Sequence, residues 1–464
     1  MAQDHKSNQP GKANKGEYEV TDMTMKFGFQ RAKKRGAGSL MAAALFLALP
    51  LSPALAQTLT TWDDYTAPLQ TEVITKLNEK FLADHPGVTI ERTGRSYDDL
   101  ILTLKLTLAS GEGPIISKAN QGAQEMGAMA KQKQLLPVDE YIAKYGWDKL
   151  QSDGLLARDR WSDKGEFGVG ATYGISTLGE MVGLYYNAKV LKDAGIDNPP
   201  ATLEELAQDI ATLKAKGTVP FMIGTAKGNM SLHMFAAVSQ ATIGAADRQA
   251  YDDLVYGHGG SWNTATNVAA AKQVQDWAAG GDFLDGYQGI AEDDAVQLFV
   301  SGKGAFLISG TWHLGEMTGN PDIHFMGVPG GSGVKDSLVV GGVDLAWTIT
   351  ANAKDKATQD LAGEYLNYMV SDEAAAAWAT AGYLPAAALK ADTVKVPALL
   401  GDALAVWNTA NAANSLGHYP DWASPTMYKT MTDNLAILLA GGETPEAFVA
   451  AIDQDYQAYM AAPK

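Results

Sequence analysis

The chain has 464 residues, no cysteine, and 36 Lys+Arg against 53 Asp+Glu, which gives a formal net charge of -17. Without cysteine it can form no disulfide framework, zinc ribbon or thiol nucleophile, and its acidity argues against a nucleic-acid partner, whose phosphates require a basic surface. With 46 % hydrophobic and 19 % charged residues, the composition is typical of a globular chain that can bury a large core.

Residues 1–56 are predicted to be an N-terminal extension that contains a secretory signal peptide. Basic residues are frequent between positions 26 and 35, an apolar run fills residues 40–51, and Ala54-Leu55-Ala56 precedes Gln57. This order of basic, apolar and small residues is typical of a cleavable signal. A membrane anchor is the less favoured interpretation, because a spanning helix needs ~20 apolar residues and this run has 12.

Cleavage near Ala56 would make the chain more acidic. The removed segment holds eight of the basic and four of the acidic residues, so the remainder has 28 and 49, a net charge of -21. An acidic, exported chain without cysteine is compatible with the bacterial periplasm, where we expect this protein.

Apolar periodicity predicts alternating helices and strands along the remainder. Helices are expected at residues 69–81, 101–108, 203–213, 294–299 and 356–370, and strands at residues 88–90, 114–116, 219–223, 305–308 and 346–349. Alternation of this kind predicts an α/β fold. No long low-complexity linker separates the segments, so two lobes would be joined by several short crossings, as in a hinged clamp.

Helix ends have recognisable signals. Thr202 can accept a hydrogen bond from the backbone of Glu205, and the Glu205 carboxylate can return a bond to the Thr202 backbone. Gly217 is expected to end that helix in a left-handed conformation. The last helix is expected to begin at Thr444-Pro445, with proline at its first position.

Motifs for nucleotides, metals and catalytic serines are absent from the sequence, and we expect no cofactor or metal. Acidic clusters occur at Asp63-Asp64 and Glu292-Asp293-Asp294, among other places. Paired carboxylates can serve a glycoside hydrolase, although most such clusters are solvated helix ends.

Five aromatic residues stand beside Gly, Pro, Asp or Ser instead of inside apolar stripes: Trp62, Trp312, Tyr383, Trp422 and Tyr428. Trp312 follows Ser309-Gly310-Thr311 at the end of a predicted strand, where its ring would project into a cleft. Aromatic faces beside carboxylates and amides are typical of sugar-binding sites. The alternative is that each ring fills the core of its own lobe.

Several segments have a distinctive order and spacing: residues 183–187 (GLYYN), 194–196 (AGI), 199–206 (PPATLEEL), 299–306 (FVSGKGAF) and 310–312 (GTW). In this order the chain resembles the extracellular solute-binding proteins of bacterial ABC importers, in particular the sugar-binding group that includes maltose-binding protein. The resemblance covers residues 57–464.

The resemblance implies a two-lobed α/β periplasmic binding protein fold, with discontinuous lobes, a hinge of three crossings and a central ligand cleft. The lobes would comprise residues 57–177 with 345–382, and residues 178–344 with 383–464. It also implies binding without catalysis, lobe closure over the ligand, and delivery to the permease of an ABC importer by a monomer.

Thirteen ligand-binding residues follow from the resemblance. Trp312 matches the family's stacking tryptophan, and Glu180 stands seven residues before Asn187, where maltose-binding protein has a sugar-binding glutamate. The other eleven come from strand ends, loops and crossings at matching places: Trp62, Asp63, Asp64, Asn120, Gln121, Asn229, His233, Asp344, Tyr383, Trp422 and Tyr428.

Some positions have a second interpretation or depart from the pattern. Asn120 could cap a helix, and His233 could be a satisfied surface group. Lys118, Asn120 and Gln121 replace aromatic and acidic residues of maltose-binding protein, which argues against maltodextrin as the ligand.

The leading hypothesis is a periplasmic protein that binds a mono- or oligosaccharide, or a related polyol or glycoside, for an ABC importer. Two alternatives remain open: a binder of a non-sugar solute such as a polyamine, and a secreted glycoside hydrolase.

Overall fold

The structure, a computed structural model, describes residues 57–331, 333–389 and 394–462. The predicted signal peptide and its cleavage point at Ala56 lie outside these residues. In the described ranges, no helix has the length and apolar character that crossing a membrane requires.

One mixed sheet is built from the beginning of the described chain and one later strand, in the order β2-β1-β3-β13-β4, with β7 also paired to β13. Its strands are β1 (Gln57–Asp63), β2 (Val88–Gly94), β3 (Ile116–Ala119), β4 (Leu135–Leu136), β7 (Gly174–Ile175) and β13 (Ala346–Thr350). β1 runs parallel to β2 and β3, whereas β13 is antiparallel to its neighbours. The carboxyl ends of β1 and β3 therefore lie at the same edge of the sheet.

A second mixed sheet has the order β14-β12-β8-β10-β9, with β11 also paired to β8. Its strands are β8 (Gly179–Asn187), β9 (Val219–Phe221), β10 (Gly304–Gly310), β11 (Ile323–Met326), β12 (Val339–Val343) and β14 (Leu416–Gly417). β10 is antiparallel to β8, with Gly310 opposite Val182. The end of β10 thus lies beside the beginning of β8. A separate two-stranded pair joins β5 (Arg160–Trp161) to β6 (Ala171–Thr172).

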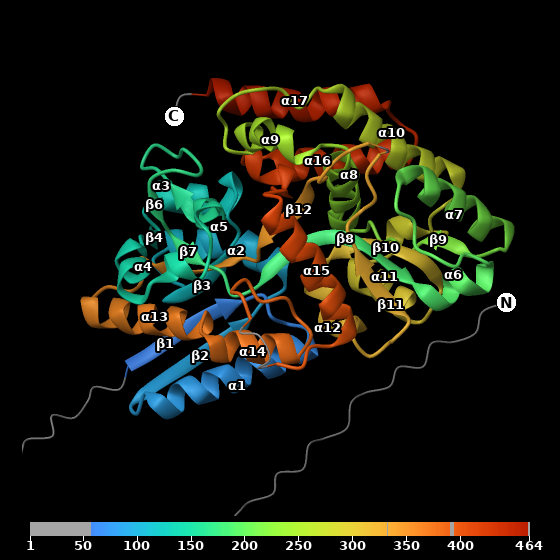
Figure 1. The fold of residues 1–464 in the computed structure, drawn as a ribbon. Coiled ribbons are helices and arrows are strands. Elements are labelled where there is room, and N and C mark those ends of the chain that lie inside the picture. The colour runs from blue at the N-terminus through green and yellow to red at the C-terminus, as the bar shows by residue number, and fades with distance from the viewer. Residues whose placement is uncertain (1–56, 332, 390–393, 463–464) are drawn as a thin grey trace, which may run out of the picture. The chain divides into compact units, whose positions relative to one another are not determined.

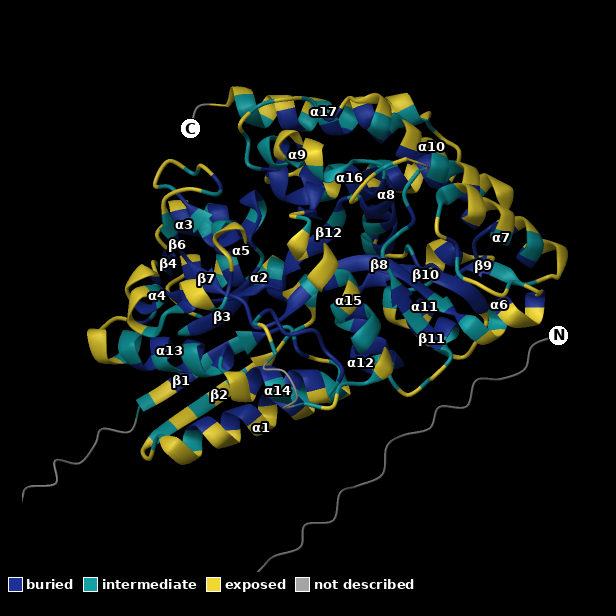
Figure 2. Ribbon diagram, viewed as in Figure 1, coloured by how far each residue is buried: buried dark blue, intermediate teal, exposed yellow. Residues whose placement is uncertain are grey.

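Helices cover both sheets (Figure 1). Around the first sheet and its loops are α1 (Pro68–Asp84), α2 (Tyr97–Ala109), α3 (Ala128–Lys131), α4 (Asp139–Tyr145), α5 (Asp153–Leu156), α13 (Lys356–Met369) and α14 (Asp372–Thr380). Around the second sheet are α6 (Ala188–Ala194), α7 (Leu203–Ala215), α8 (Asn229–Ala241), α9 (Arg248–Val255), α10 (Ala265–Gly280), α11 (Glu292–Val300), α12 (Leu314–Met317), α15 (Ala398–Ala412), α16 (Met427–Leu439) and α17 (Pro445–Ala461). Figure 2 shows β8 and β10 buried beneath helices whose outer faces are exposed.

The buried hydrophobic residues form two clusters, one within the first sheet and its helices and a larger one that joins elements of both sheets. Leu59 and Trp347 pack with Ile74 of α1 on the first sheet. Leu184 and Phe306 of the second sheet belong to the larger cluster, together with Leu104 of α2 and Ala119 of β3. Burial of these apolar side chains is the main force that holds the helices on the sheets.

The chain passes from one sheet to the other at three places. The first lies between β7 and β8, the second between β12 and β13, and the third follows α14. The three crossings are hydrogen-bonded to one another, because Gly179 donates its backbone N–H to Leu384, Ala386 donates to Thr177, and Asp344 donates to Leu178, at 2.9 to 3.0 Å.

The predicted α/β fold class is confirmed, and the predicted helix signals are found with one difference. Glu205 donates its backbone N–H to Thr202 Oγ1 at 3.1 Å, and Gly217 has a φ of 71°. The Glu205 carboxylate, however, accepts from the backbone N–H of Ala201 and not from that of Thr202. The strand expected at 219–223 ends earlier, at Phe221.

Candidate functional site

A cavity of about 510 Å³ is lined by residues from the elements of both sheets. The first sheet contributes the loops after β1 and β3 and the beginnings of α1 and α2. The second contributes the beginnings of β8, α8 and α11, the turn after β10, and side chains between residues 419 and 428. Loops at the carboxyl ends of strands are the usual place for ligand sites in α/β folds.

Aromatic rings follow one another along the cavity lining. The ring centroid of His233 lies 5.0 Å from that of Trp312 and 6.0 Å from that of Tyr419. Tyr419 in turn lies 5.1 Å from Trp422. Together Trp312, His233, Tyr419 and Trp422 form an aromatic row that offers apolar faces to a ligand.

Trp312 is held in place by Glu292, the first residue of α11. One oxygen, Glu292 Oε1, accepts from Trp312 Nε1 at 3.2 Å and from Ser309 Oγ at 3.3 Å, and lies 3.1 Å from His313 Nε2. His313 Nδ1 lies 2.9 Å from Glu316 Oε1.

This pairing sets the charges of both partners. Although burial raises the pKa of a carboxyl, the hydrogen bond from His313 and its charge lower the pKa of Glu292 to about 2. Burial by itself would lower the pKa of His313, but Glu292 and Glu316 raise it to about 10. Glu292 is therefore an anion and His313 a cation at neutral pH.

Three other polar side chains in the lining make no hydrogen bond to another described residue, although the Asp421 carboxyl accepts from its own backbone N–H. Tyr419 is 6 % exposed, and its hydroxyl has no hydrogen-bond partner. Asp421 is 9 % exposed, and burial raises its pKa to about 7. Burial, followed by the charge of Asp344, raises the pKa of Glu180 well above its usual range. Buried polar groups are normally hydrogen-bonded, so Tyr419 and Asp421, together with the half-buried Glu180, are placed to receive a ligand's polar atoms.

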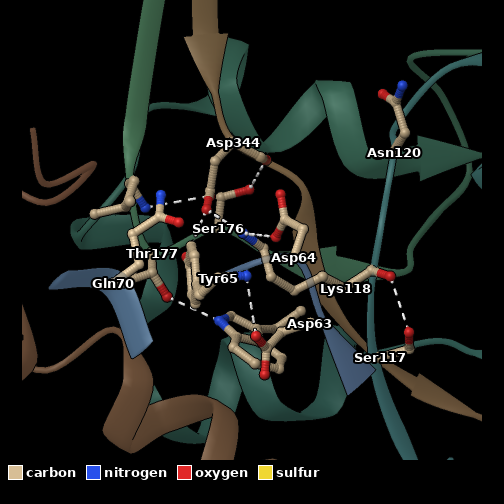
Figure 3. A network of polar contacts seen from close by, with 12 residues as sticks. Asp63, Asp64, Tyr65, Gln70, Ser117, Lys118, Asn120, Ser176, Thr177 and Asp344 are labelled. Carbon is tan, nitrogen blue, oxygen red and sulfur yellow. Dashed lines mark hydrogen bonds and ion pairs between the residues drawn. The ribbon is translucent and has the colours of Figure 1, made fainter. Parts of the chain in front are cut away.

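A buried lysine next to the cavity joins the two sheets. Lys118 Nζ lies 2.7 Å from Asp344 Oδ2, 2.8 Å from Asp64 Oδ1 and 3.7 Å from the ring centroid of Tyr65. Figure 3 shows Lys118 extending toward Asp64 and Asp344, while Asn120 points away from this group. Burial alone would lower the pKa of Lys118, but Asp344 and Asp64 raise it, so the lysine stays charged.

At another part of the lining, Lys227, which precedes α8, pairs with Asp98 of α2 at 2.6 Å. Because Asp98 belongs to the first sheet's helices and Lys227 to the second's, this ion pair also connects the two sides of the cavity.

Eight of the thirteen predicted site residues line the cavity: Asp64, Asn120, Glu180, Asn229, His233, Trp312, Trp422 and Tyr428. The Asn120 side chain donates to Tyr97 Oη at 2.9 Å instead of capping a helix. Trp312 packs partly on the core and also faces the cavity, so both interpretations of its ring hold in part.

The other five predicted residues are not part of the lining, and each has a structural partner instead. Asp63 is fully buried and binds Arg92 with both oxygens, at 2.6 and 2.7 Å. The Trp62 ring is covered by the Arg95 guanidinium at 3.7 Å.

The remaining three lie at or next to the crossings. Gln121 Nε2 donates to the backbone oxygen of Asp344 at 2.6 Å. The Asp344 carboxylate accepts from Lys118, from the Tyr65 hydroxyl and from the backbone of Leu178. Tyr383 is fully buried with its ring edge-on to Trp378, at 5.5 Å. These residues hold the crossings together instead of facing the cavity.

Sequence reasoning missed several residues of the lining: Tyr97, Glu292, His313, Tyr419 and Asp421. Tyr419 and Asp421 flank Pro420 in the turn that contains Trp422, so the rule that selected Trp422 applies to Tyr419 as well. Glu292 belongs to an acidic cluster in the first turn of a helix, which is also the usual pattern of a solvated helix end.

The profile of the bacterial extracellular solute-binding protein family matches residues 63–376. The chain belongs to this family. Among curated relatives of this solute-binding protein is the sn-glycerol-3-phosphate-binding periplasmic protein UgpB of Yersinia pestis, 30 % identical over 44 % of this chain and 46 % of that protein. The match thus spans about half the length of that relative. UgpB of Shigella dysenteriae is 25 % identical over 74 % of this chain and 77 % of its own length.

Solved structures share the fold of this solute-binding protein. A chitin oligosaccharide binding protein superposes with a TM-score of 0.76 at 20 % identity, covering 88 % of this chain and all of the other. The predicted two-lobed periplasmic binding protein fold, with lobes made of discontinuous chain and a cleft between them, is confirmed.

Within the described ranges, no group of three or more His, Asp or Glu side chains is arranged to hold a metal ion.

Proposed function

We propose that this solute-binding protein captures a carbohydrate, either a mono- or oligosaccharide or a related polyol or glycoside, in the cavity lined from both sheets. The observation that carries the proposal is the aromatic row of Trp312, His233, Tyr419 and Trp422 beside the unpartnered Tyr419 hydroxyl and the carboxyl groups of the lining. Aromatic faces pack on the C–H faces of a sugar ring, and the polar groups bind its hydroxyls.

The lobes of the proposed clamp comprise residues 57–177 with 345–382, and residues 178–344 with 383–464. The division of strands between the two sheets supports these boundaries, since β13 belongs to the first sheet and β8, β10 and β12 to the second. Ligand capture would close the lobes, and the permease of an ABC importer in the inner membrane would bind the closed form.

The place of action in this proposal is the periplasm. The protein would be exported by the signal peptide, cleaved near Ala56, and act as a monomer without catalysis. Mass spectrometry of protein recovered from a periplasmic extract tests the cleavage, with a mature chain that begins at Gln57 as the expected result.

A thermal-shift screen of mono-, di- and trisaccharides, followed by calorimetry, tests the ligand class. We expect at least one sugar to raise the melting temperature and to bind with one molecule per chain. A panel in which no sugar or polyol shifts the melting temperature would contradict the carbohydrate assignment.

Product analysis separates this proposal from a secreted glycoside hydrolase. When excess oligosaccharide is incubated with the protein, we expect stoichiometric binding and no shorter product. Release of product in proportion to time and protein would show that the chain is an enzyme.

A further inference from the structure

Carboxyl residues outnumber basic residues in the cavity lining. Seven carboxyl residues line it, namely Asp64, Asp98, Glu180, Glu292, Asp293, Glu316 and Asp421, against one lysine among the described lining residues. That lysine, Lys227, is already paired with Asp98. His313 is held between Glu292 and Glu316, and Asp64 is bound by Lys118.

Three of the seven carboxyl groups, those of Glu180, Asp293 and Asp421, form no ion pair with a described residue, and those of Glu180 and Asp421 both act on one ring. Glu180 and Asp421 make no side-chain hydrogen bond or ion pair with another described residue, although the charges of Lys118 and His313 partly offset the rise that burial causes in the pKa of Glu180. Burial raises the pKa of Tyr419, the charges of Glu180 and Asp421 raise it further, and the charge of Arg158 lowers it; the Tyr419 hydroxyl is itself unpartnered. Removing a carboxylate from water costs several kcal/mol unless a partner compensates. A ligand that brings a positive charge to this place would supply that partner, and the Tyr419 and Trp422 rings would add cation–π attraction.

We propose that the ligand of this cavity carries a protonated amine next to its hydroxyl groups, as an amino sugar does, and that Glu180 and Asp421 bind the ammonium beside Tyr419. This inference rests on the proposed carbohydrate function and names the ligand class more narrowly. It also separates this chain from the phosphate ester in the names of its UgpB relatives. A phosphate dianion would meet seven carboxyl groups here, and no unpaired Lys or Arg of the described lining would bind it.

Matched ligands test the inference by calorimetry at pH 7.5. In the sugar set, glucosamine and its β-1,4-linked oligomers are compared with glucose, with the N-acetylated oligomers, and with glucosamine 6-phosphate. In a set of smaller ligands, 3-amino-1,2-propanediol is compared with glycerol and with sn-glycerol 3-phosphate. Spermidine is included as an amine that is not a sugar. We expect each amine to bind at least tenfold more tightly than its neutral counterpart, and the phosphates to bind most weakly.

Two variants test whether the carboxyl groups of Glu180 and Asp421 cause the preference for amines over neutral ligands. Glu180→Gln and Asp421→Asn should each reduce the ratio of amine to neutral affinity at least fivefold, because each weakens the binding of the amine more than the binding of the neutral sugar. Asp209→Asn is the matched control, because Asp209 of α7 is a carboxyl with a raised pKa that does not line the cavity. It should leave the ratio unchanged.

The outcomes separate the inference from the proposed function. Neutral sugars that bind as tightly as their amines, or variants that keep the ratio, would overturn the inference and leave the carbohydrate function standing. Binding of spermidine without binding of any sugar would overturn the carbohydrate function, and with it the amino-sugar assignment. A panel in which no amine binds would overturn the inference outright.

Discussion

Trp312 has a defined position before any ligand arrives. Its indole N–H donates to Glu292 and its ring packs near His233, so one face is left for the cavity. We therefore predict that Trp312→Ala weakens binding of the preferred sugar by about 1 to 3 kcal/mol, the range for loss of an aromatic contact in a buried site. Calorimetry measures this loss, and Trp312→Phe should recover part of it. Unchanged affinity in the alanine variant would contradict the stacking role.

Asp421 is expected to destabilise the empty protein at high pH. Burial raises its pKa to about 7 from a usual value of 3.8, so the folded protein keeps a proton that the unfolded chain has lost. The favourable contribution of protonated Asp421 to the free energy of unfolding is complete below pH 4 and decreases as the pH rises toward 7. Asp421 raises the pKa of four tyrosine hydroxyls, those of Tyr97, Tyr251, Tyr419 and Tyr428, and none of these groups is a cation.

It follows that Asp421→Asn should stabilise the empty protein at pH 8, by about 2 kcal/mol, and have little effect at pH 4. Urea unfolding of both proteins at the two pH values measures this difference. The same variant is expected to lose the preference for amines, so stability and ligand selection would oppose each other at this residue. A stabilisation that is equal at both pH values would contradict the role of the charge.

Single residues also show how far sequence reasoning reaches. Trp312 and Glu180 could be predicted because strand ends and family spacing place them. Asp63 and Asp64 could not be told apart, since their difference depends on Arg92, 29 residues away, which binds Asp63 and leaves Asp64 at the cavity. Asp421 becomes notable only through its burial, which a sequence does not reveal, whereas the rule that selected Trp422 would also have selected Tyr419.

At the scale of elements, helix α7 offers a test of stability that is independent of binding. Thr202 accepts the backbone N–H of Glu205 at 3.1 Å and so caps the helix. Thr202→Ala should lower the free energy of unfolding by about 1 kcal/mol and leave ligand affinity unchanged. Thr212→Ala, on an exposed turn of the same helix, is the control. Equal effects of the two substitutions in urea unfolding would argue against the cap.

Long elements could be predicted, whereas short ones could not. Helices α1, α7 and α13 could be predicted because their apolar residues recur with helical spacing, and the same apolar faces pack on a sheet. β4, β7 and β14 have two residues each. Such strands exist because a neighbouring strand pairs with them, and two residues are too few to carry a pattern.

At the scale of the whole molecule, Asp344 connects the two sheets through Lys118. Lys118 is fully buried, and its ammonium has two carboxylate partners, Asp344 and Asp64. Asp344→Asn removes one of them and should lower the free energy of unfolding by about 3 kcal/mol, because a buried charge is left partly uncompensated. Asp336→Asn at an exposed loop should have almost no effect. A small change for Asp344→Asn would mean that Asp64 alone suffices for Lys118.

The three crossings are bonded side by side through Gly179 with Leu384, Ala386 with Thr177, and Asp344 with Leu178. A narrow ribbon of this kind resists shear and stretching within its plane, because either would break several hydrogen bonds together, while bending out of the plane breaks none. Relative motion of the two lobes should therefore have one soft direction. In the proposed closure, a single soft direction would bring Trp312 and Asn120, which follow strands of different sheets, back to the same mutual position each time, so that recognition would not depend on a search over orientations.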